Sequence, residues 1–220
     1  MAPAVFVKTS LFEQAVRRDH LVVLTGLISV CGAAWLYIFA GAGMEMGTTP
    51  SGSPTVNSTR AWTPAYLGLM FAMWWVMMIA MMLPGAAPMV LFFATINRKS
   101  GEQGRGHVPT YIFAAGYLVA WGGFSLGAVF LQWGLDSVTL LSPMMQTSSI
   151  YLGGALLIGG GLYQLTPLKH ACLRNCRSPF NMIAHSWREG AFGAFRMGIE
   201  QGLFCLGCCW VLMALLFYGG

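Results

Sequence analysis

Sulfur-containing side chains are the main candidates for chemistry in this chain. Its 220 residues include 15 methionines and six cysteines, and both types are clustered rather than scattered. Thioether and thiolate sulfurs are soft ligands that select Cu(I) among the divalent and monovalent metals of the cell. The candidate metal ligands are Met44, Met46, Met73, Met77, Met78, Met81, Met82, His170, Cys172, Cys176, Cys205, Cys208 and Cys209.

The methionines between residues 70 and 82 recur at helical spacing. Met73, Met77 and Met81 follow one another by one turn and would form a stripe along a helix, offering pairs of thioethers to a Cu(I) ion. Packing is the alternative, because methionine is flexible and fills irregular gaps between helices. Other methionines flank predicted helix ends, where an ion could enter from water: Met44, Met46, Met144 and Met145.

Five of the six cysteines lie in the last quarter of the chain, in two groups. The first group is His170, Cys172 and Cys176, within seven residues. The basic residues around it are expected to favour thiolates, since nearby cations lower a thiol pKa. A reducing cytosol disfavours structural disulfides, so we expect metal or redox use for this group.

The second group is Cys205, Cys208 and Cys209, which share one face of a predicted apolar helix. Metal binding and packing are both open for these three thiols, because free cysteine also behaves as a small hydrophobic residue. The lone Cys31 needs no explanation beyond packing. The sequence contains no hydrolytic triad, P-loop or dinucleotide fingerprint, and its four histidines are too few for a haem-copper or di-iron core. We therefore do not expect an enzyme.

The elements that must position these residues are membrane helices. Hydrophobic residues make up 56% of the chain and charged residues 9%, against about 25% charged in an ordinary soluble domain. This composition excludes a soluble enzyme or a nucleic-acid-binding module and predicts an all-α, polytopic membrane bundle in one domain. Five stretches are long and apolar enough to span a bilayer: about 21–40, 64–96, 108–133, 148–167 and 198–218. Pro84 and Pro88 predict a kink in the second.

The basic residues predict the orientation. Eleven of the twelve lysines and arginines fall in the N-terminal segment and in two loops on the same side, and only Arg60 lies opposite. The positive-inside rule then places the N-terminus in the cytoplasm of a bacterium, with the chain crossing the inner membrane several times. The first stretch exceeds a signal-peptide core, so we expect an uncleaved anchor. The segment 178–197 alternates apolar and charged residues and predicts an amphipathic helix on the inner surface.

Two kinds of helix contact are also expected. Small residues spaced by four, as in Gly123–Gly127 and Gly198–Gly202, permit helices to approach closely, and the run Gly159–Gly161 does the same. Arg196 lies one turn before Glu200, so the two are expected to form an ion pair.

Three motifs resemble a known family. The runs Met73–Pro84 with Pro88-Met89, Leu165–Arg174 with Cys176–Pro179, and Cys205–Trp210 are similar to the signature of the bacterial family called domain of unknown function 2182. That family is described as predicted metal-binding integral membrane proteins, so the resemblance implies a metal. Its members continue past the match to Gly220 into another apolar helix. Either this sequence stops before a sixth span or this member lacks that span, and a sixth span would return the C-terminus to the inner side.

The leading functional hypothesis is handling of Cu(I), as a transporter or as a protein that delivers copper, with zinc as the alternative metal. The partners would be the lipid bilayer and a copper-dependent enzyme or larger membrane complex, and no nucleic acid. A second hypothesis is a non-catalytic accessory subunit whose methionines and glycines serve helix packing. A third is a thiol redox protein, which would require oxidisable cysteines of low pKa.

Overall fold

The fold is a helical bundle, known here from a computed structural model that describes residues 4–41, 46–48, 54–56, 62–102, 108–138, 150–177 and 187–216. Its helices are α1 (Ala4–Phe39), α2 (Pro64–Glu102), α3 (Thr110–Ser137), α4 (Ile150–Gln164), α5 (Pro167–Arg177) and α7 (Gly190–Ala214). Two short antiparallel strands, β1 (Met46–Thr48) and β2 (Pro54–Val56), form a hairpin between α1 and α2. The helical architecture expected from composition is confirmed, and the hairpin is an addition to it.

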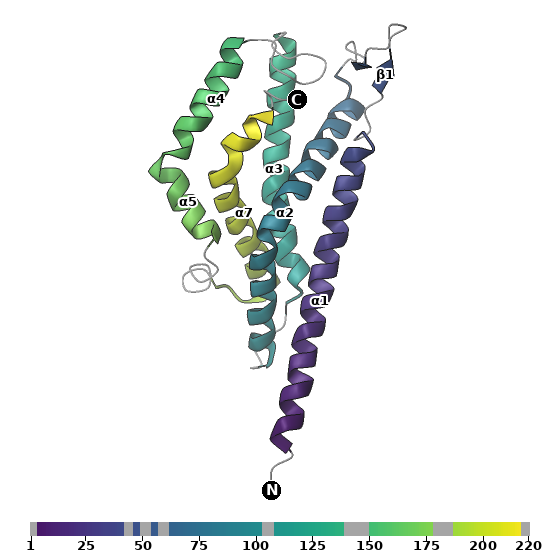
Figure 1. Cartoon of the computed structure of the whole chain (residues 1–220), viewed down its shortest axis with the longest axis vertical. Coiled ribbons are helices and arrows are strands. Elements are labelled where there is room, and N and C mark those ends of the chain that lie inside the picture. The colour runs from purple at the N-terminus through teal and green to yellow at the C-terminus, as the bar shows by residue number, and fades with distance from the viewer. Residues whose placement is uncertain are drawn as a thin grey trace.

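In the described part of the chain, four helices are long and apolar enough to cross a membrane. They are the 21–39 portion of α1, the 64–100 portion of α2, and the whole of α3 and α7. These four match the predicted stretches near 21–40, 64–96, 108–133 and 198–218. In α1 the helix begins well before its apolar portion, at Ala4, and Figure 1 shows this first part extending beyond the other helices.

The stretch predicted as a span over 148–167 is a broken helix instead. Its α4 portion has 15 residues, about 22 Å at 1.5 Å per residue, which is shorter than a membrane-spanning helix requires. The chain breaks at Leu165-Thr166 and restarts as α5 at Pro167, a residue suited to the first position of a helix. Thr166 caps the new helix, because its Oγ1 accepts a hydrogen bond from the Lys169 amide at 3.4 Å.

The surface helix predicted over 178–197 also needs correction. Residues 178–186 lie outside the described part of the chain, and residues 190–197 form the first turns of α7. Gly193, Ala194 and Met197 are buried there. These turns pack into the bundle because their small residues admit a neighbouring helix, which the pattern of apolar and charged residues did not reveal.

Helix α2 carries both prolines inside a continuous helix of 39 residues. Figure 1 shows its two halves running in different directions, as expected for a proline-containing helix. The Tyr117 hydroxyl of α3 lies 3.3 Å from the Met82 carbonyl oxygen, close to the first proline. The kink predicted from Pro84 and Pro88 is therefore a bend, without a break in the helix.

Helices α3 and α7 meet backbone to backbone along a glycine seam. A Cβ at Gly198 would collide with the Phe113 carbonyl oxygen, and one at Gly116 with the Phe195 carbonyl oxygen. At Gly202 a Cβ would lie 2.5 Å from that of Ala120. The predicted close contact at Gly198–Gly202 is confirmed. The Gly123–Gly127 pair is not used in this way, since added Cβ atoms there would meet nothing within 4 Å.

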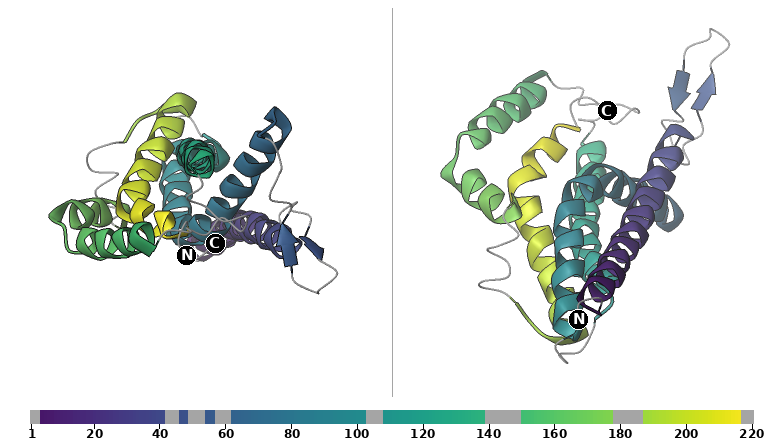
Figure 2. Two further views of the ribbon diagram at one scale, coloured as in Figure 1. Left: turned by 90° about the horizontal axis from the view of Figure 1, so that it is seen from above. Right: turned by 60° about the horizontal axis from the view of Figure 1, so that its bottom comes forward.

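The remaining helices pack around this pair (Figures 1 and 2). Helix α1 lies along α2, whereas α4 and α5 lie on the other side of the bundle. Helix α5 packs against α7, and α4 touches α7 only lightly. At Gly160 a Cβ would be in ordinary contact with the side chains of Val211 and Leu215, so this glycine faces α7, as expected.

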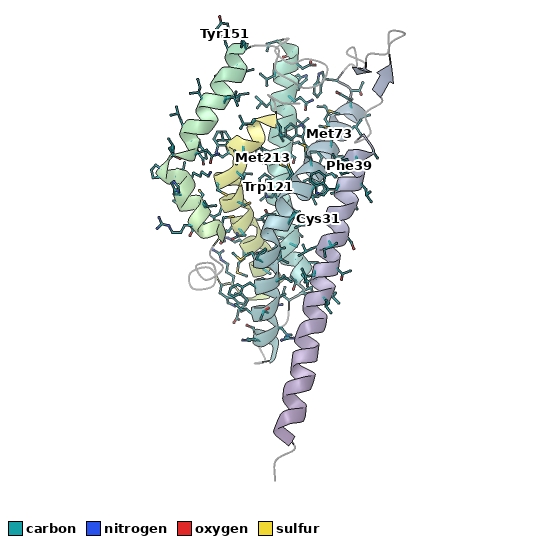
Figure 3. All side chains as sticks on the ribbon, in the orientation of Figure 1. Cys31, Phe39, Met73, Trp121, Tyr151 and Met213 are labelled. Atoms are coloured by element: carbon teal, nitrogen blue, oxygen red, sulfur yellow. The ribbon has the colours of Figure 1, made fainter. Side chains whose placement is uncertain are left out.

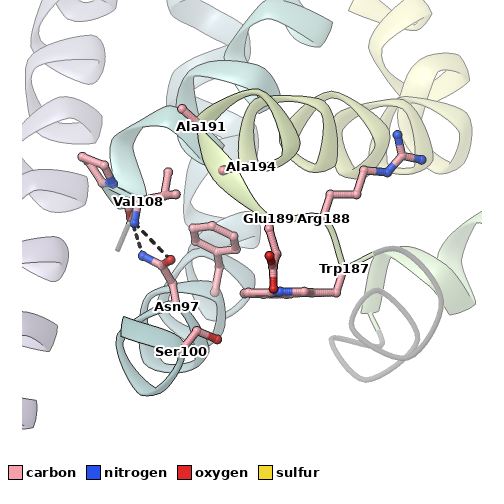
Figure 4. A pocket seen from close by; sticks show the side chains of 11 residues that line it. Asn97, Ser100, Val108, Trp187, Arg188, Glu189, Ala191 and Ala194 are labelled. Atoms are coloured by element: carbon pink, nitrogen blue, oxygen red, sulfur yellow. Dashed lines mark hydrogen bonds between the residues drawn. The ribbon is translucent and has the colours of Figure 1, made fainter. Parts of the chain in front are cut away.

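The end of the bundle where α7 begins carries an ion-pair group and a cavity. Glu200 pairs with Arg196 at 3.3 Å, as predicted, and also with Arg188 at 3.0 Å. Figure 4 shows a cavity of about 430 Å³ between the end of α2, the start of α3 and residues 187–194. Asn97 closes one side by hydrogen bonding the backbone of Val108. Among the residues that the structure describes, no cysteine or histidine lines this cavity.

Candidate metal centre

Three thiols meet where α5 packs against α7. The sulfurs of Cys176, Cys205 and Cys208 all lie within 4.8 Å of one another. Cys205 and Cys208 are buried, 8% and 3% exposed, and Cys176 is half-buried. A metal–thiolate bond of about 2.3 Å would place three sulfurs of a planar trigonal site about 4 Å apart. The three cysteines can therefore close around one ion with small side-chain movements.

The two helices run antiparallel, and hydrogen bonds near the thiols join α7 to α5 and to α4. Gln201, which is 4% exposed, donates through Nε2 to the Cys176 carbonyl oxygen at 3.1 Å. Further along α7, the Tyr163 hydroxyl donates to the Gly207 carbonyl oxygen, and the Tyr163 ring packs edge-on against Trp210. These contacts fix the register that places Cys176 opposite Cys205 and Cys208.

Two more thiols flank the three. The Cys209 sulfur lies 3.3 Å from that of Cys208. The Cys172 side chain lies against α7 at Gly207, where a Cβ would be only 2.8 Å from the Cys172 sulfur. Gly207 thus lets this thiol approach the helix. The arrangement is a row of five cysteine sulfurs along one helix pair, with three of them at metal-binding spacing.

The predicted ligands are grouped differently in the structure from the grouping expected from their spacing in the sequence. The spacing along the chain suggested one group of His170, Cys172 and Cys176 and a separate group of three cysteines on the last helix. Cys176 instead joins Cys205 and Cys208, because α5 folds back along α7. His170 is exposed on α5 and does not belong to the three-thiol group.

The methionine stripe lies in the core that adjoins the thiols. Met70, Met73 and Met78 are buried, and Met77, Met81 and Met82 are partly buried against the same core. Cys205 belongs to this core, and Cys176 and Cys209 pack against it. Figure 3 shows Met73, Trp121 and Met213 on the three helices that enclose it. Thioethers and thiols therefore form one continuous sulfur-rich interior.

Part of the stripe has a structural role. The Gln132 amide on α3 donates from Nε2 to the Met70 sulfur at 3.7 Å, and its Oε1 accepts from the Trp74 indole at 2.9 Å. In this buried network both the oxygen and the nitrogen of the Gln132 amide have a hydrogen-bond partner, and a lone pair of the Met70 sulfur accepts one of these bonds. Met70 is thus explained by packing and hydrogen bonding, whereas Met82 lies near the thiols, because Tyr117 contacts both its carbonyl oxygen and the Cys205 sulfur.

Several predicted residues fall elsewhere. Met44, Met144 and Met145 lie outside the described residues, and only the backbone of Met46, in β1, is described. Cys31 is a half-buried residue of α1, on the far side of the bundle from the thiols (Figure 3). This separation agrees with the packing interpretation of Cys31.

The surroundings of Cys176 act on its thiol in the direction opposite to that expected from its basic neighbours in the sequence. A hydrogen bond with Cys205, together with burial, raises the pKa of the Cys176 thiol. A raised pKa favours the protonated thiol when no metal is bound. A metal must displace that proton to bind, so loading of the site is coupled to proton release.

Two contributors to the site were missed by sequence reasoning. Tyr117 reaches the Cys205 sulfur at 3.3 Å from α3, and Gln201 holds the backbone of Cys176. Tyr117 carries no sequence signal, because a tyrosine in an apolar helix resembles any other packing residue. Gln201 was recognisable as a polar side chain inside an apolar stretch, which requires a partner when buried.

Comparison with protein families identifies one match, and comparison with curated proteins and with solved structures finds none. The match is to the model of PpoB2, described as a copper chaperone, and it covers residues 71–220. This range begins before Met73 and contains every cysteine except Cys31. The metal-related character implied by the resemblance above is confirmed, under this family's name rather than as domain of unknown function 2182. Because the match covers most of the chain, including the whole thiol row, the chain belongs to the PpoB2 copper chaperone family.

Proposed function

We propose that this protein is a membrane-embedded copper chaperone that holds one Cu(I) ion, as cargo, on the sulfurs of Cys176, Cys205 and Cys208. The observation that carries the proposal is the meeting of these three sulfurs within 4.8 Å at a buried helix contact. Three soft anionic ligands suit Cu(I), and a buried position shields the ion from water and from competing ligands.

The ligand count favours copper over zinc. Structural zinc sites are almost always tetrahedral, with four protein ligands. Among the described residues, no fourth cysteine, histidine or carboxylate lies within 4.8 Å of all three sulfurs. A three-thiol site matches the low coordination number that Cu(I) accepts. Family membership supports the same metal.

Delivery by ligand exchange is the mode of action that the thiol row supports. Cys172 and Cys209 flank the three-thiol site, so an ion can pass between sulfurs without leaving the protein. The acceptor would be a copper-dependent enzyme or membrane complex. We place the chain in the bacterial inner membrane with its N-terminus in the cytoplasm, because four helices have the length and composition to span it and the basic residues lie on one side. No enzymatic step is required.

The deciding experiment measures metal in the purified protein. The full chain in detergent, kept reduced, is loaded with Cu(I), competed with a chromophoric Cu(I) chelator and analysed for copper, zinc and iron. One copper per chain that survives competition supports the proposal. If the protein retains zinc instead, zinc rather than copper is its metal. Absence of all three metals after loading would favour a non-catalytic accessory subunit.

The methionines of the stripe are expected to serve transfer rather than final binding. Replacing both Met77 and Met81 with leucine should leave the equilibrium Cu(I) affinity unchanged, because the three thiolates keep their bonds to the ion. The fold should also persist, since Met-to-Leu exchanges conserve volume and cost under about 1.5 kcal/mol of stability. The same pair should slow loading of the thiols from Cu(I) supplied in solution, measured by stopped-flow absorbance.

The matched control is Met70→Leu, because Met70 already receives a hydrogen bond from Gln132. It should load at the wild-type rate. Equal loading rates for the double variant, the control and the wild type would show that the stripe only packs.

A further inference from the structure

Tyr117 of α3 contacts the thiol site through its hydroxyl group. The side chain is 1% exposed, and its oxygen lies 3.3 Å from the Cys205 sulfur and 3.3 Å from the Met82 carbonyl oxygen of α2. A phenol has one proton to donate and can also accept. The hydroxyl therefore has two neighbours that compete for a single proton.

The state of Cys205 decides which neighbour receives that proton. While Cys205 is a thiol, its S–H can donate to the Tyr117 oxygen, and Tyr117 can donate to the Met82 carbonyl. A sulfur that binds a metal has lost its proton and becomes an anionic acceptor only. The Tyr117 hydroxyl then gains most by donating to the sulfur, because hydrogen bonds to charged acceptors are about twice as strong as neutral ones.

The glycine seam holds Tyr117 where this hydrogen bond can form. A Cβ at Gly202 would lie 3.2 Å from the Tyr117 carbonyl oxygen, and one at Gly198 would lie 3.0 Å from its amide nitrogen. The backbone of Tyr117 is thus pressed against the same helix that carries Cys205, three residues beyond Gly202. The hydroxyl is placed by rigid elements, as a residue that orients a metal ligand requires.

We propose that Tyr117 is a positioning residue for the metal site, which orients the Cys205 sulfur and stabilises its metal-bound form by hydrogen bonding. This inference rests on the proposed copper function. Loss of partners that hydrogen bond a metal ligand typically costs about 10–100-fold in metal affinity, and we expect a loss in that range when the hydroxyl is removed.

The test compares two Tyr-to-Phe variants of the full chain in detergent. Tyr117→Phe removes only the oxygen near Cys205. Tyr111→Phe is the matched control, because Tyr111 is on the same helix but its side chain is 71% exposed and lies outside the thiol site. Cu(I) affinity is measured by chelator competition, and the Cu(I)–thiolate absorption band is recorded for each loaded protein.

We expect Tyr117→Phe to weaken Cu(I) binding by about 10–100-fold and to move the band to longer wavelength, since a sulfur without its hydrogen bond is a better electron donor. Tyr111→Phe should leave both the affinity and the band unchanged. Equal affinities and bands for wild type and Tyr117→Phe would overturn the role of Tyr117 and leave the copper function standing. Failure of the wild type to bind Cu(I) would overturn both.

A measurement on the unsubstituted chain covers the case in which Tyr117→Phe does not fold. Protein labelled with 3-fluorotyrosine is followed by fluorine NMR during Cu(I) loading. Among the tyrosines that the structure describes, only Tyr117 is buried, so its signal is expected to be the one least affected by a change of solvent isotope. A shift of that signal on loading, absent in Cys205→Ser, supports the proposal, and an unchanged signal in the loaded protein contradicts it.

Discussion

Replacing Cys205 with serine is expected to lower the Cu(I) affinity of the protein by more than about 100-fold. Cys205 is one of three sulfurs within 4.8 Å and is only 8% exposed, so water cannot readily take its place. Even changes outside the ligand shell typically cost about 10–100-fold in metal affinity, and a hard hydroxyl is a poor replacement for a soft thiolate. Chelator competition on the reduced protein measures the loss.

Cys31→Ser is the control for this experiment. Cys31 lies on α1, outside the family match and away from the thiol row, and is half-buried like Cys176. The Cys31→Ser variant also loses one thiol, but that thiol lies outside the site. Its Cu(I) affinity should therefore equal that of the wild type. If Cys205→Ser kept full affinity while Cys31→Ser lost it, the three-thiol site would be the wrong assignment.

Replacing Gly198 with alanine is expected to destabilise the fold by about 3 kcal/mol or more. The added Cβ would collide with the Phe113 carbonyl oxygen of α3. Backbone atoms held in a helix cannot rotate away as a side chain can, so the two helices must separate along their length. Overpacking costs about 1–3 kcal/mol even where side chains absorb the strain. A loss of 3 kcal/mol corresponds to about 6–12 °C in the thermal midpoint of a chain this size.

Gly127→Ala provides the comparison, since a Cβ at Gly127 of α3 would meet nothing within 4 Å. It introduces the same methyl group into an open position of a helix, where alanine is the better helix former by about 1 kcal/mol. Thermal unfolding followed by circular dichroism in detergent should show a lower midpoint for Gly198→Ala only. Equal midpoints for the two variants would mean that α3 and α7 are not packed backbone to backbone.

The long helices and their contacts were largely predictable. Hydropathy alone located the apolar portions of α1, α2, α3 and α7, because a bilayer-length apolar run has few other uses. The Arg196–Glu200 pair and the close approach at Gly198–Gly202 followed from helical spacing. In each case the contact depends on residues that are neighbours along one helix or on residue size. Both can be read from the sequence.

The assembly of the metal site was less predictable, because it depends on how α5 turns back. Thr166 and Pro167 begin a new, capped helix. The apolar run that crosses these two residues predicted a single span instead. Without that turn, Cys176 could not be paired with Cys205 and Cys208. Tyr117 and the Gln132–Met70 contact arise between separate helices, and no local spacing predicts them.

The glycine seam also limits the paths by which an ion can move through the bundle. On α7 the seam occupies residues 198–202, just before the thiols, and there α3 and α7 approach each other without intervening large side chains. This contact leaves no gap for a hydrated or ligated cation between the two helices. A Cu(I) ion bound at Cys205, as proposed, would therefore leave past α5, where Cys172 lies against α7 and an acceptor would dock.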